Sequence, residues 1–550
     1  MKKLLFILLS SFLLLSLFSI SLAQAQITLP TETTSLFSGS GVCAQCHDDL
    51  IDQSGTNVSP VIMWRSTMMA NAAKDPLWRA KVSAEVADLP DLQAAIEEKC
   101  IKCHAPILYK QSAHDGLTWS IADIENDPLA RDGDSCTVCH QIQADNFGEA
   151  GSFSPGFKIF DIREIYGPYD NPNFGPMLRH SNYTPVLAYP GSGYVINDSE
   201  HCATCHTLFT SYVGEDNNLI EGSSFPEQVP YLEWLNSGYP SLGADRTCQG
   251  CHMPKTLEPI NISTVGARGA RWKRSPYWYH YFVGGNVLMQ NILKNNIDTL
   301  GLTATEEHFD STILKVKDLL TTQAVNLTAS STITDTGLNI DVVIENLAGH
   351  KLPTALPLRR AWIHLKVTDA SDNIVFESGN WDENGKIIDP NPNPDQDFEP
   401  HHDVITSADQ VQIYEGIMQD VLGQVTHTLL RAASFAKDNR IPPKGFTEAF
   451  AGYPTPYTYN DVAIVGVTDD PDFNLDGSGK DTVHYEISSS GFTSPYNVLV
   501  EFCYQTVTPG EVEHLSSYNT TETQLFDDLY AQPTTDKAPV ILQSLEFTIQ

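Results

Sequence analysis

Beyond its first residues, the sequence lacks any apolar run long enough to cross a membrane. The chain begins with two lysines, an apolar stretch from Leu4 to Leu22 and the small-residue pattern Ala23-Gln24-Ala25, which is typical of a secretory signal. A retained anchor is the alternative, but the serine-interrupted run is barely long enough to span a bilayer. We therefore expect a signal peptide over residues 1–25 and an exported protein, periplasmic or extracellular, without stable membrane insertion.

Basic residues are also scarce. Lysine and arginine number 33 against 68 aspartates and glutamates, which gives a formal net charge of -35 at pH 7. A negative field of this size disfavours nucleic acid and anionic membrane surfaces as partners. Redox proteins of positive charge or bound cations fit it better, unless the acidity serves only to keep an exported protein soluble.

Cysteine is almost absent from the second half of the chain. Ten of the eleven cysteines lie between Cys43 and Cys251, and only Cys503 follows, where we expect a buried free thiol. Disulfides are common in exported proteins, but these ten cysteines instead form five C-x-x-C-H motifs.

The C-x-x-C-H motif is typical of covalent haem c attachment, because two thiols can form thioethers to one haem while the adjacent histidine ligates its iron. Thioredoxin-like sites, zinc sites and disulfides do not require a histidine after every second cysteine. We therefore predict five haem c groups. The attachment cysteines are Cys43, Cys46, Cys100, Cys103, Cys136, Cys139, Cys202, Cys205, Cys248 and Cys251, and the proximal histidines are His47, His104, His140, His206 and His252.

The motifs lie so close together that no haem has enough residues for a protein core of its own. We expect the haems themselves to form the core, as near neighbours that provide a route for electrons. Short helices and long loops should connect them, with a loop from Gly148 to Gly193 that is rich in glycine, proline and asparagine. Helices are expected over residues 91–103, 226–235, 286–300 and 305–320.

Four longer phrases carry a family resemblance. They are Trp64 to Pro76, Phe174 to His180, Tyr231 to Ser237 and Gly349 to Thr354. Together with the haem motifs they resemble a family of bacterial exported multihaem c-type cytochromes with a C-terminal β domain. The resemblance implies electron carriage but does not settle a substrate. Resemblance to multihaem nitrite reductases would require a C-x-x-C-K motif, which the sequence lacks.

The distal axial ligands decide between an electron carrier and an enzyme. Histidine or methionine occupies that position in carriers, whereas an enzyme that binds its substrate at iron leaves it open. His201, directly before Cys202, ranks low because of local crowding, and His308 is interpreted as structural. The candidate distal ligands are, in order, His180, His280, His350 and His114, followed by His401 or His402 in competition with Met68 or Met69.

From about Ser330 onward, alternating and β-branched segments predict strands. The fold class is therefore α+β, with a haem-cored, mostly helix-and-loop cytochrome domain over residues 26–325. An antiparallel β-sandwich-like domain follows over residues 326–550, with an insertion at about 389–445 in which Gln412 to Ala436 could be helical.

The segment from Asp470 to Gly477 places side-chain oxygens at alternate positions, as calcium loops do, but lacks the closing glutamate. Calcium is thus a candidate cofactor beside the five haems, and an ordinary acidic turn is the alternative.

The leading hypothesis is a non-enzymatic multihaem cytochrome that transfers electrons to and from redox protein partners. One alternative is an oxidoreductase with one open-coordination haem, and another is the subunit of a conducting filament formed by self-association.

Overall fold

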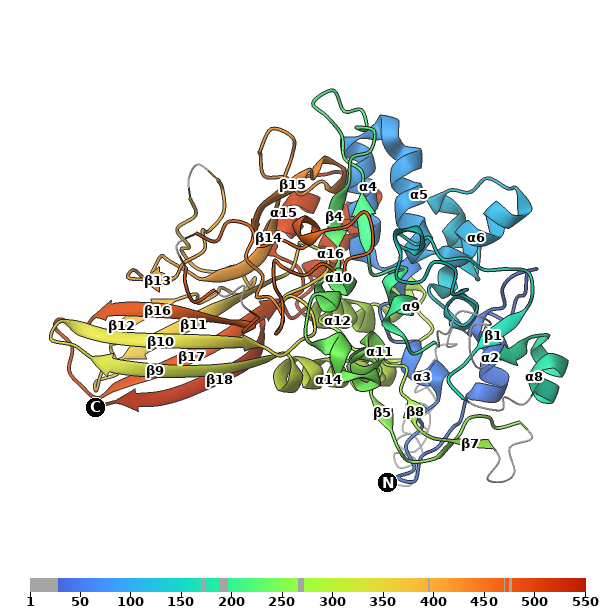
Figure 1. Ribbon diagram of the computed structural model, residues 1–550, viewed down its shortest axis with the longest axis horizontal. Helices are drawn as coiled ribbons and strands as arrows, with labels where there is room; N and C mark the ends of the chain where they lie inside the picture. Colours follow the sequence, from blue (N-terminus) through green and yellow to red (C-terminus); the bar gives the residue numbers. More distant parts are fainter. Residues whose placement is uncertain are drawn as a thin grey trace, which may run out of the picture.

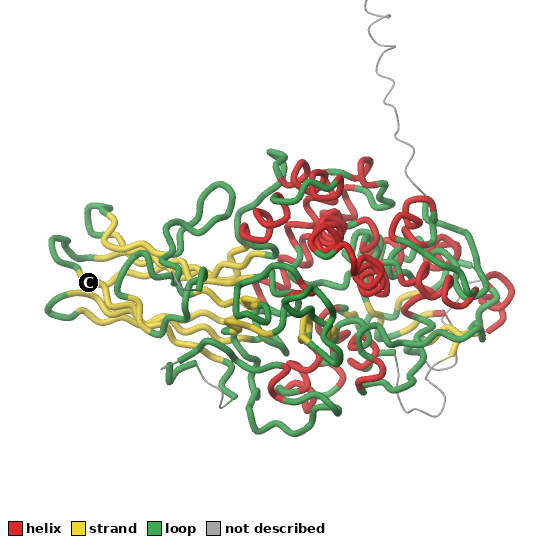
Figure 2. Tube along the Cα trace, turned by 90° about the horizontal axis from the view of Figure 1, so that it is seen from above, coloured by secondary structure: helices red, strands yellow, loops and turns green. Residues whose placement is uncertain are grey.

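The computed structural model describes residues 28–169, 174–186, 196–265, 272–393, 396–468, 470–473 and 477–550. The expected signal peptide lies outside these residues. The described chain is mainly helical and irregular up to Gln323 and rich in strands from Val325 onward, and the two parts lie at opposite ends of an elongated molecule (Figures 1 and 2). The predicted α+β fold class, with an antiparallel β domain after a helix-and-loop region, is confirmed.

Most helices of the first region are short, and half of those described carry or adjoin a cysteine motif. A helical turn brings residues three positions apart onto one face, so both thiols of a motif can meet the same macrocycle. The motifs lie in or next to α2, α5, α7, α9 and α11. The helices are α2 (Ser40–His47), α3 (Pro60–Trp64), α4 (Pro76–Asp88), α5 (Gln93–His104), α6 (Pro106–Asp115), α7 (Cys136–Cys139), α8 (Phe174–Ser181), α9 (Ser199–Ala203), α10 (Pro230–Leu235) and α11 (Cys248–His252).

Two local predictions need correction. The helix expected over residues 226–235 begins only at Pro230, because β4 (Phe225–Gln228) pairs with β3 (Leu208–Thr210). The loop expected from Gly148 to Gly193 contains α8 and a parallel pair, β1 (Glu164–Tyr166) with β2 (Thr184–Val186). Both differences come from pairing between distant segments, which composition does not reveal.

Three helices after the last motif join the two regions. They are α12 (Val287–Asn295), α13 (Ile297–Leu300) and α14 (Glu306–Gln323). Thr305 caps α14 and hydrogen-bonds reciprocally with His308, which gives this histidine the structural role predicted for it. The buried side chains of Ile292 and Phe309 belong to the same hydrophobic core as Ile340 in the β domain. A continuous core therefore connects the regions.

The β domain consists of a four-stranded and a six-stranded sheet. The first has the order β13-β16-β10-β9; the second has the order β15-β14-β11-β17-β18, with β12 also paired to β11. Strand residues alternate between buried and more exposed positions, as in β10, where Ile340, Val342 and Ile344 are buried. The strands are β9 (Val325–Ile333), β10 (Gly337–Asn346), β11 (Arg360–Thr368), β12 (Ile374–Ser378), β13 (Val404–Ile405), β14 (Ile413–Gln419), β15 (Ser434–Asp438), β16 (Lys480–Ser488), β17 (Tyr496–Gln505) and β18 (Val540–Ile549).

The segment expected as an insertion, residues 389–445, instead contributes strands to both sheets. Its Gln412–Ala436 stretch is not helical, since β14 and β15 pair antiparallel there. The short strand β13 pairs in parallel with β16. Tyr414 of β14 is buried in the core of the sandwich, and Met418 is buried in a cluster with Phe225 of β4, so tertiary packing determines this structure.

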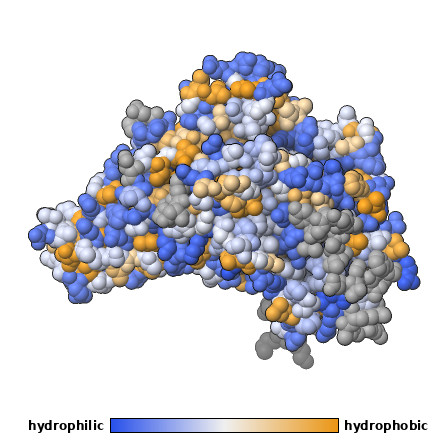
Figure 3. Space-filling view, viewed as in Figure 1, coloured by the Kyte–Doolittle hydropathy of each residue, from blue (hydrophilic) through white to orange (hydrophobic). Residues whose placement is uncertain are grey.

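Two C-terminal helices return to the first region. They are α15 (Pro509–Ser516) and α16 (Thr521–Tyr530), and both contact α4. Hydrophilic and hydrophobic residues are interspersed on the face shown in Figure 3. Among the described residues, no helix combines the length and the apolar character that a membrane span requires.

Candidate haem-binding site

A cavity of about 1240 Å³ runs through the first region and reaches the β domain. All ten cysteines and all five histidines of the C-x-x-C-H motifs line it. Five motifs spread over more than 200 positions of the chain therefore open into one shared space. A shared space of this kind suits cofactors that form the core themselves.

The cysteines of different motifs are neighbours in this cavity. The thiol of Cys136 is hydrogen-bonded with that of Cys43. This hydrogen bond is the largest cause of the raised pKa of Cys136, and burial is the second. Cys202 and Cys248 form a second such pair. The first motif thus lies beside the third, and the fourth lies beside the fifth. None of the eleven cysteines forms a disulfide, and Cys503 is fully buried in β17, as expected.

Four motif histidines share one hydrogen-bonding pattern. Their Nδ1 atom donates to a backbone carbonyl, which fixes the tautomer and leaves the Nε2 lone pair available to a metal. The acceptors are the carbonyls of Ile262 for His47 (2.6 Å), Ala72 for His104 (3.1 Å), Tyr166 for His140 (2.7 Å) and Val283 for His252 (2.5 Å).

Burial keeps these imidazoles neutral. It lowers the pKa of His104 to about 4 and that of His252 to about 4. Removal from water disfavours the imidazolium, and only the neutral ring can ligate a metal. The motif histidines are therefore in the ligating state at neutral pH.

Two of the candidate distal histidines face motif histidines across the cavity. The ring centroids of His280 and His140 are 6.4 Å apart, with 19° between the ring planes. Those of His350 and His252 are 6.1 Å apart, with 10° between the planes. Nδ1 of His280 and of His350 also donates to a backbone carbonyl, at 3.0 and 2.9 Å. Both pairs are thus near-parallel and share the tautomer that suits ligation.

The other candidates differ in their placement. Met68, Met69 and His180 line the cavity, and His180 has an exposed side chain at the end of α8. His114 lies outside the cavity on α6 and bonds Asp115. His401 and His402 lie in the β domain, bonded to carboxylates of their own surroundings. The structure does not bring these last three histidines to the cavity, because each is held by a local partner.

His201, which ranks low among the candidate ligands because of local crowding, also lines the cavity. Its ring is buried, and burial lowers its pKa to about 3. It contacts Phe147 edge to face, with ring centroids 6.1 Å apart. Its position next to Cys202 was the available signal, since that neighbour had to line the haem site.

The residues present fit haem c. The motifs supply paired thiols three positions apart and neutral, oriented imidazoles around one large space. The indole Nε1 atoms of Trp78 and Trp278 also line the cavity region, buried and without an acceptor. Buried donors normally find a partner, and an acidic group such as a haem propionate would provide one.

Comparisons with known proteins agree with this geometry. Residues 42–141 match the family described as cytochrome c554 and c-prime. No curated protein matches the chain. A solved structure of a penta-heme cytochrome c552 from Thermochromatium tepidum shares the fold, with a TM-score of 0.50 over 94% of this chain and 100% of that chain, at 15% sequence identity. The family match over residues 42–141 supports a multihaem c-type cytochrome, and the solved structure shows a similar fold.

Proposed function

We propose that the protein is an exported electron carrier that holds five haem c groups, one at each C-x-x-C-H motif. Export to the periplasm or the cell exterior rests on the N-terminal signal pattern, and the haem number rests on the motif count. Bound haem c would supply one-electron chemistry at a potential set by its axial ligands and surroundings.

The pairing of histidines across the cavity carries the proposal. Two metal–nitrogen bonds of about 2 Å, with each nitrogen about 1 Å from its ring centre, place two axial imidazoles about 6 Å apart between centroids. The His140–His280 and His252–His350 separations of 6.4 and 6.1 Å match this value. We assign His280 as the distal ligand at the third motif and His350 as the distal ligand at the fifth. At these two sites, complete axial ligation favours electron transfer over substrate binding at iron.

The chain contributes more than ligands. Carbonyl groups orient the imidazoles, the apolar cavity excludes water, and the buried indoles of Trp78 and Trp278 can donate to acidic groups. Motif one lies beside motif three and motif four beside motif five, because Cys43 neighbours Cys136 and Cys202 neighbours Cys248. Adjacent sites of one kind favour electron exchange within the molecule.

Haem content tests the proposal first. The protein, expressed in a bacterium with a haem c maturation system, should contain five haems per chain by pyridine haemochrome assay and intact mass. The Cys136→Ser/Cys139→Ser variant should contain four. Five motifs that yield fewer than five thioether-linked haems in the wild-type chain would refute the assignment.

Spectra test the carrier role. Electron paramagnetic resonance of the oxidised protein should show low-spin signals, and cyanide should not alter the signals of the two paired sites. A dominant high-spin signal that responds to cyanide would instead favour the oxidoreductase alternative.

A further inference from the structure

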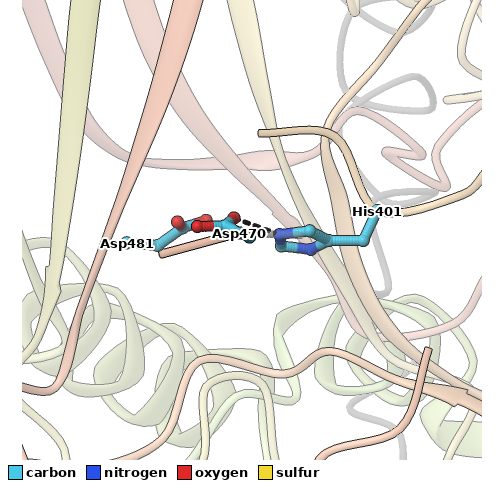
Figure 4. A group of neighbouring side chains, drawn as sticks. All are labelled: His401, Asp470 and Asp481. Atoms are coloured by element: carbon cyan, nitrogen blue, oxygen red, sulfur yellow. Dashed lines mark hydrogen bonds and ion pairs between the residues drawn. The ribbon is translucent and has the colours of Figure 1, made fainter. Parts of the chain in front are cut away.

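Three segments of the β domain bring carboxylates and imidazoles together at one edge of the four-stranded sheet. His401 and Asp403 precede β13, Asp470 lies in a loop, and Asp481 belongs to β16. One side-chain atom from each of His401, Asp470 and Asp481 lies within 4.8 Å of the others. Figure 4 shows the three side chains directed toward one another. This group is separate from the haem cavity, because none of these residues lines it.

Asp481 is the unusual member of the group. Its side chain is fully buried, and Oδ1 has no hydrogen-bond partner, while Oδ2 accepts from the hydroxyl of Tyr414. A buried carboxylate oxygen without a donor or counter-charge costs considerable free energy. The ammonium of Lys437, which acts on the neighbouring His401, bonds two backbone carbonyls and Glu415 instead of Asp481.

The hydrogen bonds of His401 define its role. Its Nδ1 accepts from the side-chain amides of Gln412 (2.8 Å) and Asn439 (3.0 Å). Both amides are fixed in orientation, because each amide oxygen accepts from a backbone N–H. The ring proton must therefore be on Nε2, which donates to Oδ2 of Asp470 at 2.7 Å. His401 positions Asp470 and has no lone pair free for a metal.

A third carboxylate, that of Asp403, lies close enough to those of Asp470 and Asp481 for the three charges to repel one another. Asp403 lies directly before β13, which pairs with β16; its Oδ1 has no hydrogen-bond partner and lies 3.9 Å from Nε2 of His484. Both ring nitrogens of His484 are already bonded to carboxylates, those of Asp341 and Asp472. The available donors are thus oxygens, whereas zinc and copper sites depend on imidazole or thiolate ligands. Calcium takes six to eight oxygen ligands and tolerates irregular geometry.

We propose that Asp481 and Asp470, with Asp403, bind a hard divalent cation of the calcium class at the edge of the β-sandwich. This assignment sharpens the calcium prediction made for the loop from Asp470 to Gly477, whose Asp476 lies outside the described residues. The cation would connect β16, the Asp470 loop and the segment before β13. It would also neutralise carboxylates that the fold holds together in a strongly acidic chain.

Calorimetric titration of the chelator-treated, haem-loaded protein with calcium chloride tests the proposal. The wild type should bind one calcium ion at this site and unfold at a higher temperature with calcium than without it. Asp481→Asn keeps the size of the side chain and the contact with Tyr414, and should weaken binding at least tenfold and remove the thermal shift. Asp335→Asn, in the exposed turn between β9 and β10, is the matched control and should behave as wild type.

The result does not depend on electron transfer, since haem content and haem spectra should be the same in all these proteins. If Asp481→Asn does not fold, Asp470→Asn replaces it, with the same expected loss. Absence of calcium binding by the wild type, unchanged binding in the folded variant, or preference of the site for zinc over calcium would overturn the proposal.

Discussion

At the scale of single residues, hydrogen bonding at Nδ1 separates the histidines that can ligate a metal from those that cannot. His280 and His350 donate from Nδ1 to backbone carbonyls, whereas Nδ1 of His401 accepts from two amides. The imidazoles of His280 and His350 therefore keep the Nε2 lone pair for a metal, whereas that of His401 carries its proton on Nε2. The difference arises from the neighbours that the fold supplies, because an isolated imidazole has no fixed tautomer.

Removal of one distal histidine should change one haem alone. In His350→Ala we expect five haems per chain but loss of one low-spin signal, with a new high-spin signal that binds cyanide, because the iron at the fifth motif loses an axial ligand. His280→Ala should do the same at the third motif. Low-temperature electron paramagnetic resonance measures both.

His114→Ala is the control for these variants, since His114 lies on the exposed surface of α6 outside the cavity. It should keep every low-spin signal. An unchanged spectrum in His350→Ala, or a changed spectrum in His114→Ala, would contradict the ligand assignment.

The sequence predicted the attachment residues because their signal is local. Two cysteines and a histidine within five positions define each motif, and all fifteen residues line the cavity. The distal ligands have no such signal. His140 and His280 meet across the cavity although they lie 140 positions apart in sequence, so only the fold shows which histidine faces which motif.

At the scale of elements, the loop between β10 and β11 attaches the β domain to α10. Glu233 of α10 is fully buried, and its Oε2 accepts from the backbone N–H of Lys351 (3.1 Å) and the hydroxyl of Thr354 (2.5 Å). Arg440 lies 3.4 Å from Oε1. Because Lys351 follows His350 directly, this contact positions the imidazole that faces the fifth motif.

Glu233→Ala should therefore destabilise the protein and disturb one haem. Removal of one partner from a buried charged network costs about 3–5 kcal/mol. Chemical denaturation should show a loss of this size, and the low-spin signal assigned to the fifth motif should broaden or decrease. Glu221→Ala, at an exposed position, should alter neither quantity; equal effects of the two substitutions would exclude a positioning role.

A second buried network joins α4 to α15. Nζ of Lys81 lies 2.9 Å from a carboxylate oxygen of Glu511, whose other oxygen bonds His427 at 2.9 Å. Burial alone would raise the pKa of Glu511, but Lys81 and then His427 hold it down to about 2. The carboxylate is thus more acidic in the folded chain than in the unfolded chain.

This pKa predicts a specific acid dependence. A group with a lowered folded pKa stabilises the fold above its unfolded pKa, near 4.5, and this contribution is lost as the pH falls toward 2. The contribution amounts to about 3 kcal/mol. In Glu511→Gln, the free energy of unfolding should be lower at pH 7 and should decrease less between pH 4.5 and pH 2 than in wild type. Parallel curves for the two proteins would contradict the network's role.

Sequence patterns predict an element well where its signal is local, and poorly where its structure depends on pairing with another strand. The helices α5 and α14 lie close to the ranges that helical patterns predict, residues 91–103 and 305–320. The strands β14 and β15 are not predicted, because the Gln412–Ala436 segment has no local signal that outweighs a helix. Only pairing with β11 and packing of Tyr414 within the sandwich make that segment extended.

At the scale of the whole molecule, charge should govern the choice of redox partner. The sequence carries a formal charge of -35, and the field of such a chain attracts cations over distances set by ionic strength. The Debye length falls from about 30 Å at 0.01 M to about 10 Å at 0.1 M salt, so attraction should matter most in dilute buffer.

Stopped-flow oxidation of the reduced protein tests this expectation with two small acceptors of opposite charge. The rate with a cationic ruthenium hexaammine complex should fall by about tenfold or more as the ionic strength rises from 0.01 to 0.5 M, because screening removes the attraction. The rate with anionic ferricyanide should rise over the same range, because screening removes a repulsion. The pair of acceptors separates charge from changes in the haems themselves, which would move both rates in one direction. Rates that do not depend on salt, or that respond with the opposite signs, would show that electrons leave through a surface whose local charge differs from that of the chain as a whole.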